Sequence, residues 1–272
     1  MHVMDLGQRA GAVLLFGGPY SNLAATHAVL RCAERGGIAQ DHVICTGDVV
    51  AYCAEAAQTV ETVRRAGCAV VAGNCEKQLA ARAVDCGCGF DAGSACDLLS
   101  AGWYAHADAQ IGPEERAWMG GLPDVVVFEQ AGRRVAVIHG GVTNVSRFIW
   151  PTSPEAVFAE EVETLRDLLG PVEMVIAGHC GLAFQRDVAG VLWVNAGVVG
   201  MPPNDGRAET RFATLEDGVP VIHELSYDHG SAFKTMQEAG LTQGYDAGLV
   251  SGYWPSEDVL PPELRRVDLA SG

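Results

Sequence analysis

The chain has 272 residues, of which 49% are hydrophobic, and its formal net charge is −16. This length fits one large α/β domain, and the hydrophobic content is sufficient for a sizeable core. The negative charge argues against binding to a nucleic-acid polymer or to a membrane surface, because both require a basic patch on the protein.

Three strands alternate with three helices in the first part of the chain. Apolar runs predict strands at residues 12–16, 42–46 and 68–72. Helical spacing follows each run, at 22–35, at 54–66 and from 76 onward. This alternation predicts a largely parallel sheet that is covered by helices.

Residues 85–123 interrupt the alternation with a Gly- and Cys-rich loop and two helices, at 95–107 and 113–118. A helix at 154–169 follows, among strands at 125–129, 134–138, 174–177, 191–195, 211–215 and 219–225. Turn signals at Gly190 and Asp217-Gly218 give the last strands a hairpin character. We therefore predict an α/β protein with two sheets packed as a sandwich between helices.

The whole chain, residues 1–272, is expected to form a single domain with a helical insert at about 85–123. From about residue 245 to 272, a Pro-rich segment is expected to be extended, and to pack over the body or to reach a partner subunit of a homo-oligomer. No apolar run approaches the roughly 18 residues of a membrane span, and residues 1–9 lack the apolar core of a secretory signal. We expect a cytoplasmic protein without a membrane partner.

Nine cysteines in a chain without a secretory signal favour reduced thiols over a disulfide framework. Cys86, Cys88 and Cys96 form a C-x-C-x7-C cluster, which fits free thiols in a loop. A zinc site completed by Cys75 or His106 is the alternative, although the spacing matches no common structural zinc motif.

Four polar motifs each follow a predicted strand. Gly47-Asp48 and Gly73-Asn74 end the second and third strands, while His139-Gly140 and Gly178-His179 follow two later ones. The carboxyl ends of strands are where ligands gather in α/β proteins, and glycine lets the backbone approach an ion closely. One carboxylate, one amide oxygen and two imidazoles form a plausible shell for Mn²⁺, Fe²⁺, Ni²⁺ or Zn²⁺. Asp48, Asn74, His139 and His179 are therefore the candidate metal ligands.

The spacing of these motifs resembles that of the calcineurin-like metallophosphoesterases, particularly their compact bacterial branch. The resemblance covers about residues 12–225 and includes the motifs listed above, Gly73-Asn74-Cys75-Glu76 among them, and the later Asn195-Ala196-Gly197 turn. It implies a four-layer α/β/β/α sandwich with mixed sheets. It also implies a two-metal site in which a bridging hydroxide attacks phosphorus, with Asp48, His139 and His179 as catalytic residues.

The chain departs from the family at the ligands of one metal. The family's first motif, Asp-x-His, corresponds here to Gly18 and Tyr20, and the second histidine of its last motif corresponds to Gly181. Cys75 stands where the family has a histidine that assists the leaving group. The resemblance thus implies that one metal site is lost and that the site of Asp48, Asn74, His139 and His179 is whole. Tyr20 either fills the vacated volume or supplies a phenol as ligand or acid.

These observations predict a metal-dependent phosphoesterase that hydrolyses a small phosphorylated substrate, with one tightly bound divalent ion. The alternatives are an impaired family member that binds a phosphorylated ligand or a metal without turnover, and a structural protein that uses its Trp254-Pro255 tail for assembly. Asn22, Arg147 and Arg207 are candidate substrate contacts, and surface salt bridges are the alternative for the two arginines.

Overall fold

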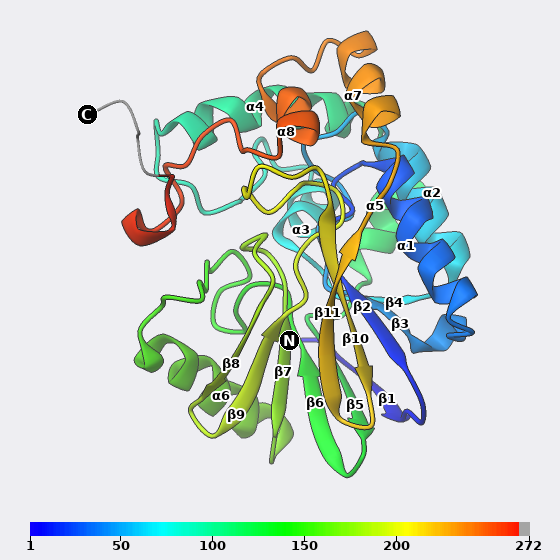
Figure 1. Cartoon of the computed structure of the whole chain (residues 1–272), viewed down its shortest axis with the longest axis vertical. Helices are drawn as coiled ribbons and strands as arrows, with labels where there is room; N and C mark the ends of the chain where they lie inside the picture. Colours follow the sequence, from blue (N-terminus) through cyan, green and yellow to red (C-terminus); the bar gives the residue numbers. More distant parts are fainter. Residues whose placement is uncertain (267–272) are drawn as a thin grey trace.

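Two mixed β-sheets form the centre of the computed structural model, which describes residues 1–266 (Figure 1). The larger sheet has the order β1-β5-β6-β7-β9-β8, with the bounds Val3–Gln8, Val125–Gln130, Arg133–Val137, Met174–Ala177, Val191–Asn195 and Phe184–Val188. The smaller sheet has the order β11-β10-β2-β3-β4, with the bounds Val219–Leu225, Thr210–Glu216, Val13–Phe16, Val43–Cys45 and Ala69–Val70.

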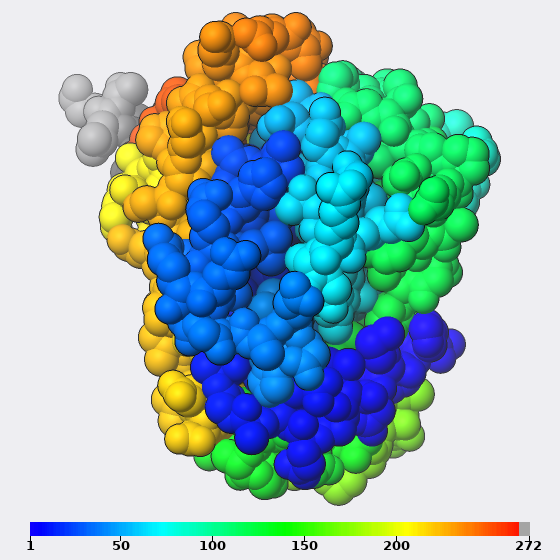
Figure 2. Space-filling view, turned by 90° about the vertical axis from the view of Figure 1, so that its right-hand side faces the viewer, coloured from blue at the N-terminus to red at the C-terminus, as the bar shows by residue number. Residues whose placement is uncertain are grey.

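Helices cover the outer faces of both sheets. The α-helices of the described residues are α1 (Leu23–Arg35), α2 (Ala56–Ala66), α3 (Asn74–Ala81), α4 (Ala95–Gln110), α5 (Pro113–Gly120), α6 (Glu155–Leu169), α7 (His229–Glu238) and α8 (Tyr245–Ser251). Helices α1 and α2 share a hydrophobic cluster with the smaller sheet, and α6 shares one with the larger sheet. Figure 2 shows α1 and α2 side by side on one face, with the N-terminal segment below them.

Alternation along the strands explains the layers. In β2, Val13 and Leu15 point into the cluster between the two sheets, whereas Leu14 and Phe16 belong to the cluster beneath the helices. All four side chains are buried, because a strand with a sheet on one side and helices on the other has no solvent-facing side. The predicted sandwich of two sheets between helices is confirmed.

The sheet topology brings strand ends from both sheets to one place. Strands β2, β3 and β4 run parallel in the smaller sheet, and β6 and β7 run parallel in the larger one. The loops that follow β3, β4, β6 and β7 carry the four polar motifs, and they meet at a common edge of the sandwich.

Four elements lie outside the sequence prediction. Strand β1 pairs with β5, and β8 forms a hairpin with β9, although Asp5 interrupts the apolar run of β1 and Arg186 and Asp187 interrupt that of β8. Helix α7 follows β11, and α8 occupies residues 245–251, where an extended tail was expected; that expectation is wrong for these residues. Residues 267–272 of the expected tail lie outside the described residues. None of the helices within residues 1–266 is long and apolar enough to cross a membrane.

Candidate metal centre

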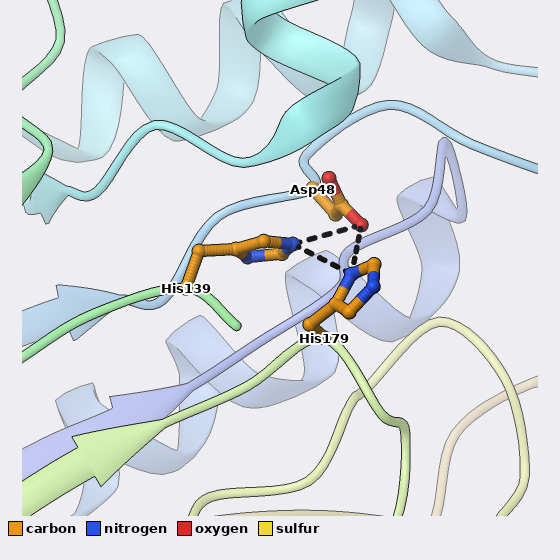
Figure 3. A group of neighbouring side chains, drawn as sticks. All are labelled: Asp48, His139 and His179. Atoms are coloured by element: carbon orange, nitrogen blue, oxygen red, sulfur yellow. Dashed lines mark hydrogen bonds and ion pairs between the residues drawn. The ribbon is translucent and has the colours of Figure 1, made fainter. Parts of the chain in front are cut away.

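The structure brings the four candidate ligands together in the interior. Asp48 follows β3, Asn74 begins α3 just after β4, and His139 and His179 follow β6 and β7. Their side chains are buried. One ligand atom each from Asp48, His139 and His179 lies within 4.8 Å of the others, as Figure 3 shows.

The distances between the ligand atoms suit a single small cation. The Nε2 atom of His139 lies 3.0 Å from Nδ1 of His179, 3.2 Å from Oδ1 of Asn74 and 3.3 Å from Oδ2 of Asp48. The distance from His179 Nδ1 to Asp48 Oδ2 is 3.9 Å. Atoms about 2.0 Å from a tetrahedral ion are separated by about 3.3 Å, so the cluster needs little adjustment to hold one.

Hydrogen bonds on the far side of each imidazole fix which nitrogen faces the centre. His139 donates from Nδ1 to the carbonyl oxygen of Thr46 at 2.7 Å, and His179 donates from Nε2 to that of Ser146 at 3.1 Å. Because a carbonyl oxygen can only accept, each of these nitrogens carries the ring hydrogen. The opposite nitrogens therefore present lone pairs to the centre, as metal-binding histidines do.

The amide and the carboxylate are oriented in the same way. Asn74 donates from Nδ2 to the carbonyl oxygen of Cys86 at 2.9 Å and to Sγ of Cys88 at 3.4 Å, which turns its Oδ1 to the centre. Asp48 accepts from the backbone N–H of Cys75 through Oδ1 at 3.3 Å, which leaves Oδ2 for the centre. Four lone-pair donors thus converge on one point, and a divalent cation fits this donor set.

The electrostatics of the cluster also favour a positive charge at its centre. Burial opposes ionisation of Asp48, but the two imidazoles outweigh it and hold the pKa of Asp48 well below its ordinary value. Burial lowers the pKa of His139, yet the Asp48 carboxylate more than compensates and the pKa is raised. For His179, burial dominates and the pKa is lowered. A proton on His139 and a metal ion compete for the same position.

Glu76 stabilises the loops that carry the ligands and was not singled out as a site residue from the sequence. Its buried carboxylate accepts from the backbone N–H groups of Asp48 at 2.8 Å, Val49 at 2.9 Å and Gly73 at 2.9 Å. Burial, reinforced by Asp48, raises the pKa of Glu76 to about 7. The signal in the sequence is its place three residues after the N-cap Gly73 of α3, the capping-box position.

The three positions at which the resemblance implies lost ligands, Gly18, Tyr20 and Gly181, lie among aromatic and aliphatic side chains. A Cβ atom on Gly18 would lie 2.6 Å from Cζ of Tyr20 and 2.7 Å from Cγ1 of Val198. A Cβ atom on Gly181 would lie 3.1 Å from Cζ2 of Trp254. Tyr20 is itself buried, and burial followed by the charge of Asp48 raises its pKa well above the ordinary value.

The candidate substrate contacts are engaged with other groups. Asn22 is the N-cap of α1, with Oδ1 accepting from the N–H of Ala25 at 3.1 Å, and Nδ2 donating to the carbonyl oxygen of Gly200 at 3.0 Å. Arg147, in the loop after His139, forms ion pairs with Glu160 and Glu161 at 2.8 and 2.7 Å. Arg207 is exposed and paired with Glu224. Salt bridges thus describe both arginines here, and a substrate role for the three residues stays a prediction.

The cysteine cluster is divided by the structure. Cys86 and Cys88 form a disulfide, so the expectation of free thiols is wrong for these two; the turn at Gly87, with φ of 58°, brings their Cα atoms to 5.3 Å. Cys75 and Cys96 are free and buried. His106 hydrogen-bonds to the carbonyl oxygen of Ala54, far along the chain from the cluster. A zinc site of Cys86, Cys88 and Cys96 is incompatible with the disulfide.

The fold and the centre together define an α/β sandwich with a cage of cation ligands at its strand ends. The model of the calcineurin-like phosphoesterase superfamily domain matches residues 21–218, a span that contains all four candidate ligands. The chain belongs to this superfamily, as its motifs predict. The match begins after Gly18 and Tyr20.

Solved structures share the fold at low sequence identity. A metallophosphoesterase from Sphaerobacter thermophilus is 22% identical, with a TM-score of 0.68, over 90% of this chain and 100% of that one. The protein PH1004 from Pyrococcus horikoshii OT3 is 16% identical, with a TM-score of 0.70, over 89% of this chain and 98% of that one. None of the curated proteins compared with the chain matches it.

Proposed function

We propose that the protein is a metal-dependent phosphoesterase that hydrolyses a small phosphorylated substrate with one tightly bound divalent cation, Mn²⁺, Fe²⁺, Ni²⁺ or Zn²⁺. The observation that carries the proposal is the convergence of four lone-pair donors, each turned inward by a hydrogen bond on its far side. Asp48, Asn74, His139 and His179 would hold the ion. When bound, such an ion polarises a phosphoryl oxygen and lowers the pKa of water toward about 7.

The chain's own residues would position the reacting groups and balance the charge of the cation. In hydrolysis, the oxygen of water forms a bond to phosphorus, the ester P–O bond breaks, and the departing oxygen takes a proton. Asp48 supplies a negative charge that balances the cation, and Glu76 fixes the backbone of Asp48 and of Gly73. Cys75 stands beside this centre in place of an imidazole, and burial raises its pKa well above the ordinary thiol value. We therefore expect slow turnover, because no imidazole at this position protonates the leaving group.

A single ion, rather than two, is proposed because two of the other ligand positions hold glycine and the third holds a buried tyrosine whose raised pKa keeps its phenol protonated. Gly18 and Gly181 have no side chain, and Tyr20 and Trp254 lie where side chains at these glycines would extend. The same observation favours the second candidate function, an impaired relative that binds a phosphorylated ligand without turnover. One ion stabilises the negative charge that develops on the phosphoryl group in the transition state less than two ions do.

Metal content and hydrolysis test the proposal together. Purified protein reloaded with Mn²⁺ or Ni²⁺ should contain one ion per chain by elemental analysis and should hydrolyse a phosphomonoester or a phosphodiester. Asp48→Asn should lose the ion and the activity, whereas Asp167→Asn, an exposed aspartate on α6, should retain both. If the protein binds metal but hydrolyses neither ester with any of the ions, the phosphoesterase activity is excluded and the second candidate function is supported. A protein that binds no ion would contradict both.

A further inference from the structure

An aromatic pocket opens directly beside His179. Its six aromatic lining residues are Tyr20, Tyr52, Phe90, Phe148, Tyr245 and Trp254. The centre of a water-sized sphere can occupy about 50 Å³ of the pocket, and the empty space is about 510 Å³ when the open solvent at its mouth is included. Within residues 1–266, no aspartate, glutamate, lysine or arginine contributes to its lining. The pocket is thus uncharged apart from the imidazole at its inner end.

Five of the rings form two groups in contact, and one of these groups reaches the candidate metal centre. The ring centroid of Phe148 lies 4.4 Å from that of His179. In the other group, Tyr52 stacks on Tyr245 with centroids 4.5 Å apart and meets the edge of Tyr20 at 4.7 Å. A group in the pocket would therefore contact ring faces and edges and would lie next to a metal ligand.

The pocket includes two of the three positions at which the resemblance implies a lost ligand. Gly181 and Tyr20 line it, and Trp254, from the segment after α8, packs over Gly181. Where the family resemblance implies charged and imidazole ligands for a second ion, this chain has apolar contact surface.

We propose that this pocket binds the uncharged aromatic group of the substrate, an aryl ring or a nucleobase, so that the substrates are phosphate esters of aromatic alcohols or of nucleosides. This inference rests on the proposed function, which supplies the phosphate. A charged group would lose its hydration in the pocket without gaining an opposite charge, whereas a planar aromatic group gains stacking and buries its surface. The phosphate has no cationic partner in the pocket, so it would lie toward the cation that Asp48 and His179 are proposed to hold.

Binding of uncharged aromatic alcohols to the metal-free protein tests the pocket independently of catalysis. By calorimetric titration, phenol should bind at least about fivefold more tightly than cyclohexanol, which has similar size but no ring face. Phe90→Leu and Trp254→Leu should each weaken phenol binding by about fivefold or more, and Trp118→Leu, a half-buried tryptophan outside the pocket, should not. Phe90 lies in a loop and is half-buried, so its variant is expected to fold even if Trp254→Leu does not.

Adenosine in place of phenol distinguishes the two sources of the aromatic group. Tighter binding of adenosine assigns the pocket to a nucleobase, and binding of phenol alone assigns it to a smaller aryl ring; either supports the proposal. With metal-loaded protein, Phe90→Leu should raise KM for phenyl phosphate and leave that for methyl phosphate unchanged.

Two results separate the failure of this inference from that of the proposed function. Equal affinity for phenol and cyclohexanol, or unchanged phenol binding in both pocket variants, would overturn the pocket assignment. If phenol binds selectively but no ester is hydrolysed with any metal, the phosphoesterase activity is overturned and the pocket remains an aromatic binding site.

Discussion

The Nε2 atom of His139 and the Nδ1 atom of His179 face one another at 3.0 Å, each with its lone pair turned inward by a backbone carbonyl on the far side of the ring. Two lone pairs at this distance repel, so the pair is stable only when a cation or a proton lies between them. The relationship makes folding and cation binding interdependent.

Metal should therefore stabilise the folded protein. At a free metal concentration about 100 times Kd, the free energy of unfolding should rise by about 2.7 kcal/mol. Urea unfolding with Mn²⁺ and with a chelator measures this difference. His179→Asn should abolish most of it, and His27→Asn, at an exposed position on α1, should leave it intact. The same stabilisation in His179→Asn as in the wild type would contradict the ligand assignment.

Gly73→Ala should damage the centre without straining the backbone. Gly73 has φ of −80°, which alanine adopts readily, but its Cβ atom would lie 2.6 Å from the backbone nitrogen of Asp48 and 2.8 Å from Oε2 of Glu76. We expect a loss of about 1–3 kcal/mol in stability and a large loss of metal affinity. Gly230→Ala in α7 is the matched control, because its Cβ atom meets no other atom closer than 3.7 Å. Unchanged metal affinity in Gly73→Ala would show that the loops of Asp48 and Asn74 can move apart freely.

The Cys86–Cys88 loop should influence metal affinity through Asn74. The Nδ2 group of Asn74 donates to the carbonyl oxygen of Cys86 and to Sγ of Cys88, and these bonds hold its Oδ1 at the centre. Replacement of both cysteines by serine should weaken Mn²⁺ binding by about 10-fold, in the range found when groups behind metal ligands are removed. Titration calorimetry measures the change, and the pair Cys32→Ser with Cys68→Ser, two free half-buried cysteines, is the control. If the Cys86/Cys88 double variant bound Mn²⁺ as tightly as the Cys32/Cys68 control, the disulfide loop would have no influence on metal affinity.

Asp124 should contribute stability that disappears in acid. Burial alone would raise its pKa, but hydrogen bonds from Lys77 and from the backbone N–H of His2 lower it below the ordinary 3.8. Because the pKa is lowered by folding, the contribution is present above about pH 4 and is lost as the pH falls through the folded-state pKa. The partners are partly exposed, so about 0.5–1 kcal/mol is expected. Between pH 6 and pH 3, the free energy of unfolding of the wild type should fall by about 0.5–1 kcal/mol more than that of Asp124→Asn. The control Asp167→Asn should behave as the wild type does.

The sequence predicted those parts of the site that depend on side chains in a regular pattern. Asp48, Asn74, His139 and His179 each follow an apolar run, and strand ends necessarily meet at an edge of the sandwich. The carbonyl groups of Thr46 and Ser146, which orient the imidazoles, could not be predicted, because every residue has a carbonyl and only the fold selects one. The fold was predictable where alternation or helical spacing was long, and it was missed in β1, β8, α7 and α8, where charged residues or glycines obscure it.

The aromatic pocket was unpredictable for a different reason. Its rings come from positions as distant as Tyr20 and Trp254, in loops without periodic spacing. Tyr20 could be singled out only because the family resemblance implied a ligand at its position. Trp254 lies in a segment expected to be extended, and only the packing of that segment against Gly181 gives the ring a place in the pocket wall.

The position of β2 in the smaller sheet has a consequence for synthesis of the chain. Its neighbours are β3, which follows it closely, and β10, whose residues 213–215 pair with residues 13–15. While the chain emerges from the ribosome, one edge of β2 has no partner until residues 213–215 have been made, about 200 residues after β2 itself. All four candidate ligands emerge before that point. The smaller sheet, whose strands β3 and β4 lead to Asp48 and Asn74, is therefore completed only after the last of the four ligands, His179, has been made.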